Sequence, residues 1–375
     1  MLFKTFGGAF AVTAIGLVLA YLYGGATGLA VAAILGVLEI SVSFDNAVVN
    51  ATYLQKLNDF WQKMFLTVGV LIAVFGMRLL FPVVIVCVTA QISPAEAYRL
   101  ALDGGSVDTP GTYAYLLSQA HPAIAAFGGM FLLMLFLDFM FEEREISWLA
   151  WLERPLARIG KLDQVSVIVA GSVLLVFAGY LTPAQSREKV LVAGVLGLIV
   201  YILVNGLGDF FQSEEEAEEA EEAEAAASGR GTGDIVRLAG RAAFGVFLYL
   251  EVLDATFSFD GVIGAFAITS DPIIIAIGLG IGAMYIRSLT VFLVRKGVLG
   301  EYVYLEHGAQ WAIGSLALLL LFTIQHEVPE VVTGLIGVGF IGASFLSSVV
   351  RNRRAQQLEE PDDEPDPELS ERAGV

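Results

Sequence analysis

The stretch EISVSFDN, residues 39–46, lies within an apolar segment that covers residues 27–52. A similar stretch, DATFSFDG, residues 254–261, lies within a second apolar segment over residues 240–268. In each stretch a carboxylate is followed by a serine four residues later and by a second carboxylate six residues later. A charge at the centre of a bilayer costs about 2.5–3.5 kcal/mol on insertion scales, so acids in such segments need partners or a function.

The composition is typical of a polytopic membrane protein. Of the 375 residues, 56% are hydrophobic and only 16% are charged, whereas about 25% of residues are charged in average soluble domains. A membrane span needs about 20 mostly apolar residues, and ten segments meet this requirement. The predicted spans cover residues 4–23, 27–52, 64–90, 121–142, 164–182, 189–211, 240–268, 272–294, 308–325 and 329–350. We therefore expect an all-α transmembrane helix bundle that is surrounded by the lipid bilayer and binds no nucleic acid.

The formal net charge of −18 is concentrated in two short segments. Eight glutamates lie within residues 213–224 and eight acids within residues 359–371, which leaves 23 acids against the 21 Lys and Arg of the whole chain. Neither segment has enough apolar surface to fold alone. We expect a solvated acidic linker over residues 212–234 and a solvated acidic tail over residues 351–375.

Lys and Arg are divided unequally between the two sides of the expected bundle. When loops are assigned alternately to two sides, sixteen of these residues fall on the side of the N-terminus and three on the other. Short loops rich in Lys and Arg face the cytoplasm. The N-terminus, the acidic linker and the C-terminus are therefore expected in the cytoplasm, with the protein in the inner (cell) membrane. Only Arg78 and Arg287 remain, and both lie inside predicted spans.

These two arginines belong to an internal repeat. The local spacings agree at each step: six residues between acids, nine from glycine to arginine and seven from histidine to glycine. The first copy contains Glu39, Ser43, Asp45, Gly69, Arg78, His121 and Gly128, and the second contains Asp254, Ser258, Asp260, Gly278, Arg287, His307 and Gly314. We expect one half over residues 1–186 and the other over residues 187–211 and 235–350. With five spans in each half, equivalent helices cross in opposite directions, an arrangement found in many secondary transporters.

The repeated polar side chains carry oxygen donors. On a regular helix Glu39, Ser43 and Asn46 share one face, and the same holds for Asp254, Ser258 and Gly261 in the second copy. Oxygen donors suit hard divalent cations such as Mn²⁺, Mg²⁺ or Ca²⁺ better than Zn²⁺ or Cu⁺. The sequence therefore predicts a mid-membrane cation site shared by the two halves, with the cation as transported cargo rather than as a permanently bound cofactor.

The second aspartates, Asp45 and Asp260, lie about 120° away from that face on a regular helix. Each joins the site only where its helix loosens, or else it faces a different partner such as Arg78 or Arg287. An alternative to transport follows from the same residues. If the buried acids serve only as ion-pair partners of the two arginines, the protein is a non-transporting membrane scaffold or stress-resistance protein.

At these residues the chain resembles the TerC family of integral membrane proteins, whose two marks are E-x-x-x-S-x-D-N and D-x-x-x-S-x-D-S. Residues 39–46 match the first mark, and residues 254–261 depart from the second at Gly261, where the family has serine. The resemblance covers about residues 39–142 and 251–325, and the long insertions are typical of a divergent branch. It implies efflux of manganese or a related divalent cation through an acidic site shared between the halves, although Gly261 puts the metal preference in doubt.

Two further features allow other interpretations. His121 and His307 lie at the start of equivalent predicted spans. They are either ligands at a gate or interfacial side chains at the starts of helices.

The sequence GLGDFF, residues 206–211, contains the G-x-G-D pattern of intramembrane aspartyl proteases, but the Tyr-Asp and Pro-Ala-Leu motifs of those enzymes are absent. No P-loop, H-E-x-x-H or G-x-S-x-G motif occurs either. We therefore expect a transporter rather than an enzyme.

Overall fold

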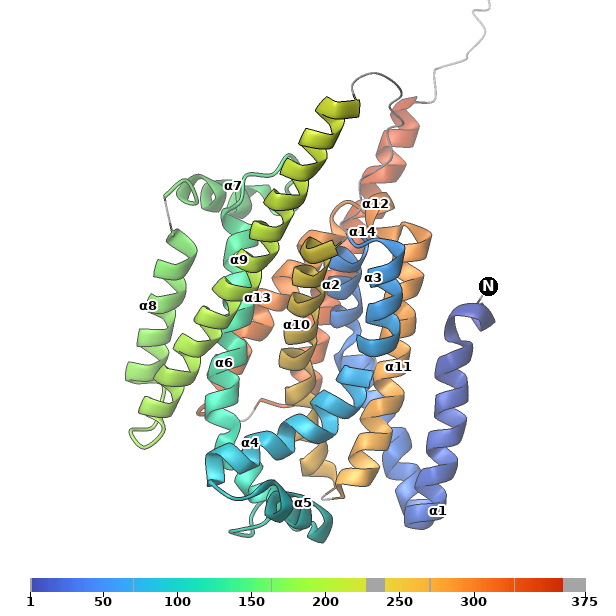
Figure 1. Cartoon of the computed structure of the whole chain (residues 1–375), viewed down its shortest axis with the longest axis vertical. Coiled ribbons are helices and arrows are strands. Elements are labelled where there is room, and N and C mark those ends of the chain that lie inside the picture. The colour runs from blue at the N-terminus through green and yellow to red at the C-terminus, as the bar shows by residue number, and fades with distance from the viewer. Residues whose placement is uncertain are drawn as a thin grey trace, which may run out of the picture.

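The computed structural model describes residues 2–69, 71–162, 164–226, 240–269, 271–326 and 328–359. Every regular element in this part of the chain is helical, which confirms the all-α prediction. Figure 1 shows these helices gathered in a bundle. The side chains of Asp45 and Asp260 lie outside those that the structure describes, although both residues belong to helices.

The first half of the chain contains ten helical elements. They are α1 (Leu2–Val42), α2 (Phe44–Leu54), α3 (Asp59–Met64), η1 (Phe65–Gly69), η2 (Ile72–Leu80), α4 (Phe81–Ala90), α5 (Pro94–Asp103), α6 (Tyr113–Phe141), α7 (Ala150–Ile159) and α8 (Val165–Tyr180), counted over the described residues. The second half continues with α9 (Arg187–Ala226), α10 (Gly240–Ile268), α11 (Pro272–Lys296), α12 (Val298–Glu301), α13 (Leu305–Thr323) and α14 (Glu330–Glu359).

Seven helices in the described part of the chain are long and apolar enough to cross a membrane. They cover Thr5–Ile40, Asp59–Gly76, Tyr113–Phe141, Arg187–Gly206, Pro272–Lys296, Leu305–Thr323 and Val332–Arg354, and the shorter Val165–Tyr180 is also apolar. Large apolar side chains are exposed on the outer helices, among them Leu22, Leu175 and Leu335. A surface this apolar suits contact with lipid rather than water. The chain is a multi-pass membrane protein.

The first helix, α1, consists of two arms that meet at Gly25. This glycine has φ of 63° and ψ of −153°, a conformation that other residues rarely adopt. A Cβ atom added to Gly28 would lie 2.7 Å from the carbonyl oxygen of Ala20. In a straight helix the same two residues would be about 12 Å apart, so the chain reverses direction here. The two arms correspond to the predicted span 4–23 and to the first part of the predicted span 27–52.

The first acidic motif is broken at Ser43, whereas the second is not. Ser43, with φ of −96° and ψ of 18°, lies between the end of α1 and the start of α2. Ser, Asp and Asn are weak helix formers, and all three types cluster at this point. In contrast, α10 continues through residues 254–261 without interruption. The first motif therefore does not lie on one regular helix, and the shared face of Glu39, Ser43 and Asn46 stays a prediction.

The helical run between α3 and α4 is wound more loosely than an α-helix. Both η1, which ends at Gly69, and η2, which contains Arg78, are π-helices. Turns of this kind are rare and occur frequently at functional sites. The η2 segment packs against α10 and α11. The predicted span 64–90 is therefore helical but irregular at the level of the two acidic motifs.

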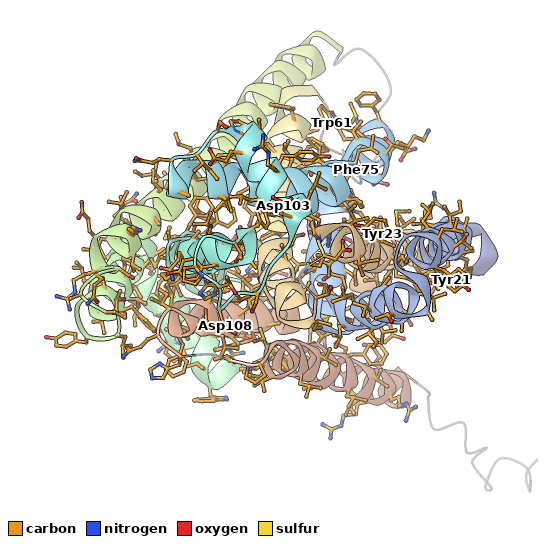
Figure 2. The ribbon with its side chains drawn as sticks, turned by 90° about the horizontal axis from the view of Figure 1, so that it is seen from below. Tyr21, Tyr23, Trp61, Phe75, Asp103 and Asp108 are labelled. Atoms are coloured by element: carbon orange, nitrogen blue, oxygen red, sulfur yellow. The ribbon has the colours of Figure 1, made fainter. Side chains whose placement is uncertain are left out.

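The two ends of the bundle carry different elements. In Figure 1, α5 lies at one end, and α7, α12 and the end of α14 lie at the other. Figure 2 views the molecule from the α5 end, with Asp103 and Asp108 on α5 and the loop that follows it. Because α4 leads into α5 and α11 leads into α12, the runs 64–90 and 272–294 cross the bundle in opposite directions.

Both predicted acidic segments begin inside helices. α9 continues past the predicted span 189–211 to Ala226, which places the first part of the acidic linker in a helix. α14 likewise extends into the acidic tail as far as Glu359. The remainder of each segment, residues 227–234 of the linker and 360–375 of the tail, lies outside the described residues.

Candidate cation site in the membrane region

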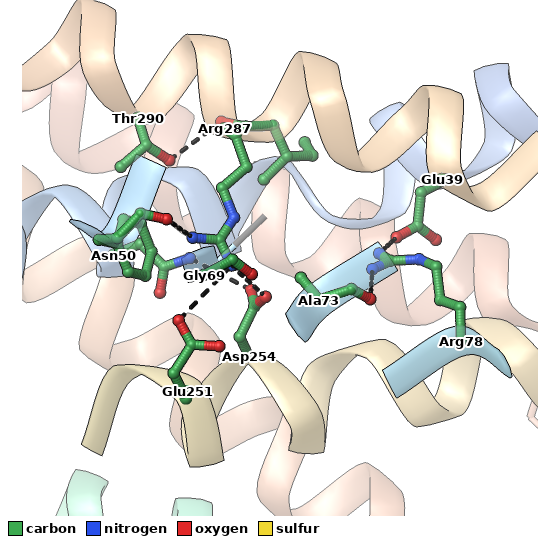
Figure 3. A network of polar contacts seen from close by, with 11 residues as sticks. Glu39, Asn50, Gly69, Ala73, Arg78, Glu251, Asp254, Arg287 and Thr290 are labelled. Atoms are coloured by element: carbon green, nitrogen blue, oxygen red, sulfur yellow. Dashed lines mark hydrogen bonds and ion pairs between the residues drawn. The ribbon is translucent and has the colours of Figure 1, made fainter. Parts of the chain in front are cut away.

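Glu39, near the end of α1, forms a buried ion pair with Arg78 of η2. Nη2 of Arg78 lies 2.5 Å from Oε1 of Glu39, and Nη1 donates a 2.8 Å hydrogen bond to the backbone carbonyl of Ala73. Helices of the second half approach this pair closely. A Cβ atom on Gly261 would lie 2.9 Å from Oε2 of Glu39, and one on Gly282 would lie 2.3 Å from its Cγ. The pair is therefore enclosed by residues of both halves, on the right of Figure 3.

Asp254 of α10 forms a second ion pair, with Arg287 of α11. Nη2 of Arg287 lies 2.9 Å from Oδ2 of Asp254. The guanidinium also donates hydrogen bonds of 2.8 Å and 3.1 Å to the carbonyl groups of Phe65 and Gly69. Its carbon lies 3.9 Å from the centroid of the Phe65 ring, within cation–π distance. Arg287 thus ties α10 and α11 of the second half to η1 of the first.

Glu251 is a third buried carboxylate, and the sequence analysis missed it. It precedes Asp254 by three residues on α10 and therefore shares its face, and its Oε1 lies 4.0 Å from Nη2 of Arg287. Neither of its oxygens has a hydrogen-bond partner among the described residues. Glu251 has no counterpart in the first copy of the repeat, where Gly36 precedes Glu39 by three residues. A search by repeat therefore does not find it, although its place inside an apolar segment is a sufficient signal.

Asn50 of α2 contributes an amide to the same group. Its Nδ2 donates a 3.4 Å hydrogen bond to Oδ1 of Asp254, while its Oδ1 has no hydrogen-bond partner among the described residues. Gly69 permits the close approach of η1, because a Cβ atom there would lie 2.4 Å from Oε1 of Glu251 and 2.9 Å from Nη1 of Arg287. Residues of the first half thus line a site whose acids come from the second (Figure 3).

The structure separates Glu39 from Asp254. Glu39 faces Gly261, which follows Asp254 by seven residues, or about 10 Å along α10 at 1.5 Å per residue. The two carboxylates therefore do not face each other across one gap. Each is held by the arginine of its own half, Arg78 or Arg287, so two ion-paired groups occur in place of one shared site. Each group nevertheless combines residues of both halves.

The smaller polar residues of the motifs are placed as follows. Ser43, Asn46 and Ser258 are buried, and their role as ligands stays a prediction. Within the described residues, no three His, Cys, Asp or Glu side chains converge as they would around a metal ion. Asp45 and Asp260 belong to α2 and α10, and the direction of their side chains is outside what the structure describes.

The two repeated histidines have different surroundings. His307 is the third residue of α13 and is buried, with Nδ1 3.1 Å from Oε2 of Glu153 in α7. His121 is half-buried and lies eight residues into α6, whose N-terminus is capped by Thr112. His121 therefore does not start its helix, because the capped helix begins two turns earlier. A gating role for either histidine stays a prediction.

Glu153 anchors the amphipathic helix α7 to α13. Its carboxylate accepts hydrogen bonds from the backbone N–H groups of Trp148 and Leu149 and from Nε1 of Trp311. Burial raises the pKa of this carboxyl, but the contacts with His307 and Trp311 lower it more, so its pKa lies below the ordinary value of 4.5. A cavity of about 430 Å³ lies beside this carboxylate. The sequence offered no signal for this anchor, because its members come from distant segments.

No curated protein and no solved structure matches the chain. One family model, described as "Protein of unknown function (DUF475)", matches residues 44–355. The matched region contains Asp254, Glu251, Asn50 and both buried arginines, and it begins five residues after Glu39. This region is most of the chain, and the protein belongs to the DUF475 family.

Proposed function

We propose that this protein is a membrane transporter that exports a divalent metal cation, with Mn²⁺ as the first candidate. The proposal rests on an excess of buried carboxylates. Among the described side chains, Glu39, Asp254 and Glu251 share only Arg78 and Arg287. A bundle that used ion pairs only for structure would balance these charges, because an unpaired charge in a dry interior is costly. The excess of negative charge favours a site that a cation visits.

In this mechanism each arginine occupies its carboxylate while no cargo is bound. The planar guanidinium donates to carboxylates and carbonyl groups, and these oxygens are also the donors that Mn²⁺ accepts. A cation that enters the site competes with the guanidinium, and the ion pair forms again when the cation leaves. Glu39 and Asp254 are therefore never left without a positive partner inside the membrane.

The inverted repeat of two five-span halves is part of the proposal. Two sets of equivalent contacts support it. The two ion pairs join equivalent positions of the repeat. Gly69 packs against Glu251, and in the other half the equivalent Gly278 packs against Gly36, the equivalent of Glu251. A Cβ atom added to Gly36 would lie 3.4 Å from the carbonyl oxygen of Gly278. The opposite directions of the runs 64–90 and 272–294 also support an inverted arrangement. The ten spans are assigned by counting both arms of α1, together with α8 and α10.

We assign the α7 end of the bundle to the cytoplasm of the inner membrane. Arg158, Lys296 and Arg354 lie on elements that end there, whereas Arg99 lies on α5 at the opposite end. An excess of Lys and Arg marks the cytoplasmic face. With this orientation, export moves the cation from the α7 end towards the α5 end.

A second candidate is a membrane scaffold that transports nothing. The pair between Glu39 and Arg78 favours it, because one carboxylate and one guanidinium neutralise each other without a cation. The two candidates differ in their expectation for the second aspartates, Asp45 and Asp260. If these side chains only partner arginines, their removal weakens the fold, whereas cargo ligands can be neutralised without that loss.

The test compares cells that lack the protein with cells that carry the wild type, Asp45→Asn or Asp260→Asn. We expect the wild type to lower cellular Mn²⁺ and to raise Mn²⁺ tolerance, and both variants to lose these effects. The variants should reach the membrane and unfold in detergent at the wild-type temperature or above. Variants that lose stability but still confer tolerance would make the aspartates structural. A wild type without effect on any divalent cation would contradict transport.

A further inference from the structure

We propose that a hard divalent cation binds at a site formed by Glu251, Asp254, Asn50 and the carbonyl groups of Phe65 and Gly69. While no cation is bound, the guanidinium of Arg287 takes its place. Only the direction of transport through this site rests on the proposed function. The binding site itself follows from the contacts of the guanidinium and from the atoms around it that have no partner.

The guanidinium of Arg287 is surrounded by oxygen atoms from two helical elements, η1 and α10. It donates to the carbonyl groups of Phe65 and Gly69 at 2.8 Å and 3.1 Å, and it contacts Oδ2 of Asp254 at 2.9 Å. Oε1 of Glu251 lies 4.0 Å away. Carboxylate and carbonyl oxygens are the ligands that Mn²⁺, Mg²⁺ and Ca²⁺ take in proteins. The arginine therefore fills a set of donors suited to a hard cation.

Three oxygen atoms in this group have no hydrogen-bond partner among the described residues: both carboxylate oxygens of Glu251 and Oδ1 of Asn50. Glu251 is 5% exposed and Asn50 is 1% exposed. Buried polar atoms are almost always satisfied, so three together at one place call for a bound group. An ionised carboxylate and an amide oxygen are acceptors, so the three atoms suit a cation better than an anion.

The charges of the group point the same way. Glu251 and Asp254 carry two negative charges when ionised, and Arg287 supplies one positive charge. A divalent cation that displaces the guanidinium balances both carboxylates. Arg287 is held by Asp254 and by the Phe65 ring, whose centroid lies 3.9 Å from the guanidinium carbon. The ring offers a favourable surface along which the guanidinium can withdraw from the carboxylates.

The first half does not repeat this site. Its equivalent of Glu251 is Gly36, so Glu39 and Arg78 form a one-to-one pair among the described side chains. The described cation site is therefore asymmetric, although the surrounding framework is repeated. This asymmetry makes Glu251 the residue whose removal separates a cation site from a structural ion pair.

The test measures binding of Mn²⁺ alone to the purified full-length chain in lipid nanodiscs, by electron paramagnetic resonance of the free ion. We expect Glu251→Gln and Asn50→Leu each to weaken binding by at least about tenfold, since loss of even an outer partner of a ligand costs that much. Glu96→Gln, at an exposed position on α5, is the control and should bind as the wild type does. Arg287→Lys gives up the forked contacts to the carbonyl groups and should bind Mn²⁺ more tightly.

The outcomes separate this site from the proposed function. Wild-type affinity in both Glu251→Gln and Asn50→Leu, weaker binding in Arg287→Lys, or no Mn²⁺ binding by the wild type at millimolar concentration would each overturn the site. If the variants bind as expected but the wild type moves no Mn²⁺ across proteoliposomes, the site stands and export is wrong. Should Glu251→Gln fail to fold, Asn50→Leu and Arg287→Lys still decide, together with the rise in thermal stability that Mn²⁺ gives the wild type.

Discussion

The carboxylate of Glu251 lies 4.0 Å from the guanidinium of Arg287, which Asp254 already binds at 2.9 Å. Among the described side chains, one guanidinium therefore faces two carboxylates in the second half, whereas Arg78 faces only Glu39 in the first. The two arginines occupy equivalent positions of the repeat, but Arg287 has one more carboxylate beside it than Arg78 has among the described side chains. Their response to the loss of one carboxylate should differ accordingly.

Neutralising Glu39 should destabilise the protein more than neutralising Asp254. Glu39→Gln removes the carboxylate that pairs with the buried guanidinium of Arg78 among the described side chains, and breaking a buried pair typically costs about 3–5 kcal/mol. Asp254→Asn leaves Glu251 close to Arg287, so the loss should be nearer to that of a charged hydrogen bond, about 1.5–3 kcal/mol. Unfolding in mixed detergent, followed by the helical circular dichroism signal, measures both free energies of unfolding.

A double variant provides the matched control for this comparison. Glu251→Gln combined with Asp254→Asn leaves Arg287 as isolated as Arg78 is in Glu39→Gln, so its cost should rise to the same range, about 3–5 kcal/mol. If Asp254→Asn alone is already as damaging as Glu39→Gln, Glu251 does not act as a second partner. The contact between Glu251 and Arg287 would then have no energetic consequence.

Gly69 should tolerate no side chain, although it lies in a helical segment. Gly69→Ala places a Cβ atom 2.4 Å from Oε1 of Glu251 and 2.9 Å from Nη1 of Arg287, so the ion-paired group must shift. Overpacking of this kind costs about 1–3 kcal/mol. Gly76→Ala in η2 is the control, because its Cβ atom would meet nothing closer than 3.6 Å. We expect Gly69→Ala to lower the unfolding temperature and weaken Mn²⁺ binding, and Gly76→Ala to do neither.

Much of the architecture follows from composition and spacing. The apolar runs predict a multi-pass helical bundle, and the repeat identifies Arg78 and Arg287 as buried charges that need acidic partners. The choice of partner does not follow. A spacing in sequence fixes an angle around a helix only while the helix is regular, and the break at Ser43 together with the π-helical turns around Gly69 removes that regularity.

Glu251 and Glu153 illustrate two limits of reasoning from the sequence. Glu251 has no counterpart in the first copy, where Gly36 stands, so a search based on the repeat passes over it. Glu153 lies on an amphipathic helix whose charges are expected to face solvent. It is buried because Trp311 and His307, from the distant helix α13, meet it there. Contacts between distant segments are a property of the tertiary fold and leave no local pattern.

The docking of α7 should depend on pH through Glu153. Its folded pKa lies below 4.5, so the ionised carboxylate contributes stability that is fully present above pH 4.5 and is lost as the pH falls through the folded pKa. Hydrogen–deuterium exchange of residues 150–159 should therefore show protection at neutral pH that declines in acid. Glu153→Gln should expose these residues at neutral pH and remove the pH dependence.

A second acid near α7 provides the control. Glu143 is exposed and pairs with the exposed Lys161, a contact of a kind that contributes little to stability. Glu143→Gln should leave the exchange of α7 and its pH dependence unchanged. Equal effects of the two substitutions would mean that net charge near α7, rather than the anchor made by Glu153, controls its docking.

The orientation of the bundle is open to a labelling test in intact cells. Cys87 is the only cysteine in the sequence, so Cys87→Ser supplies a background without thiols. Into it we place one cysteine at a time, as Ser228→Cys in the acidic linker, Ala355→Cys in the acidic tail or Asp108→Cys in the loop after α5. A membrane-impermeant maleimide should label Asp108→Cys in intact cells and the other two only after permeabilisation, because the side rich in Lys and Arg faces the cytoplasm.

Labelling of Ser228→Cys and Ala355→Cys but not of Asp108→Cys would mean that the protein has the opposite orientation. The proposed direction of transport would then be uptake rather than export. Labelling of only one of Ser228→Cys and Ala355→Cys would require an odd number of spans between them, which the inverted repeat of two five-span halves does not allow.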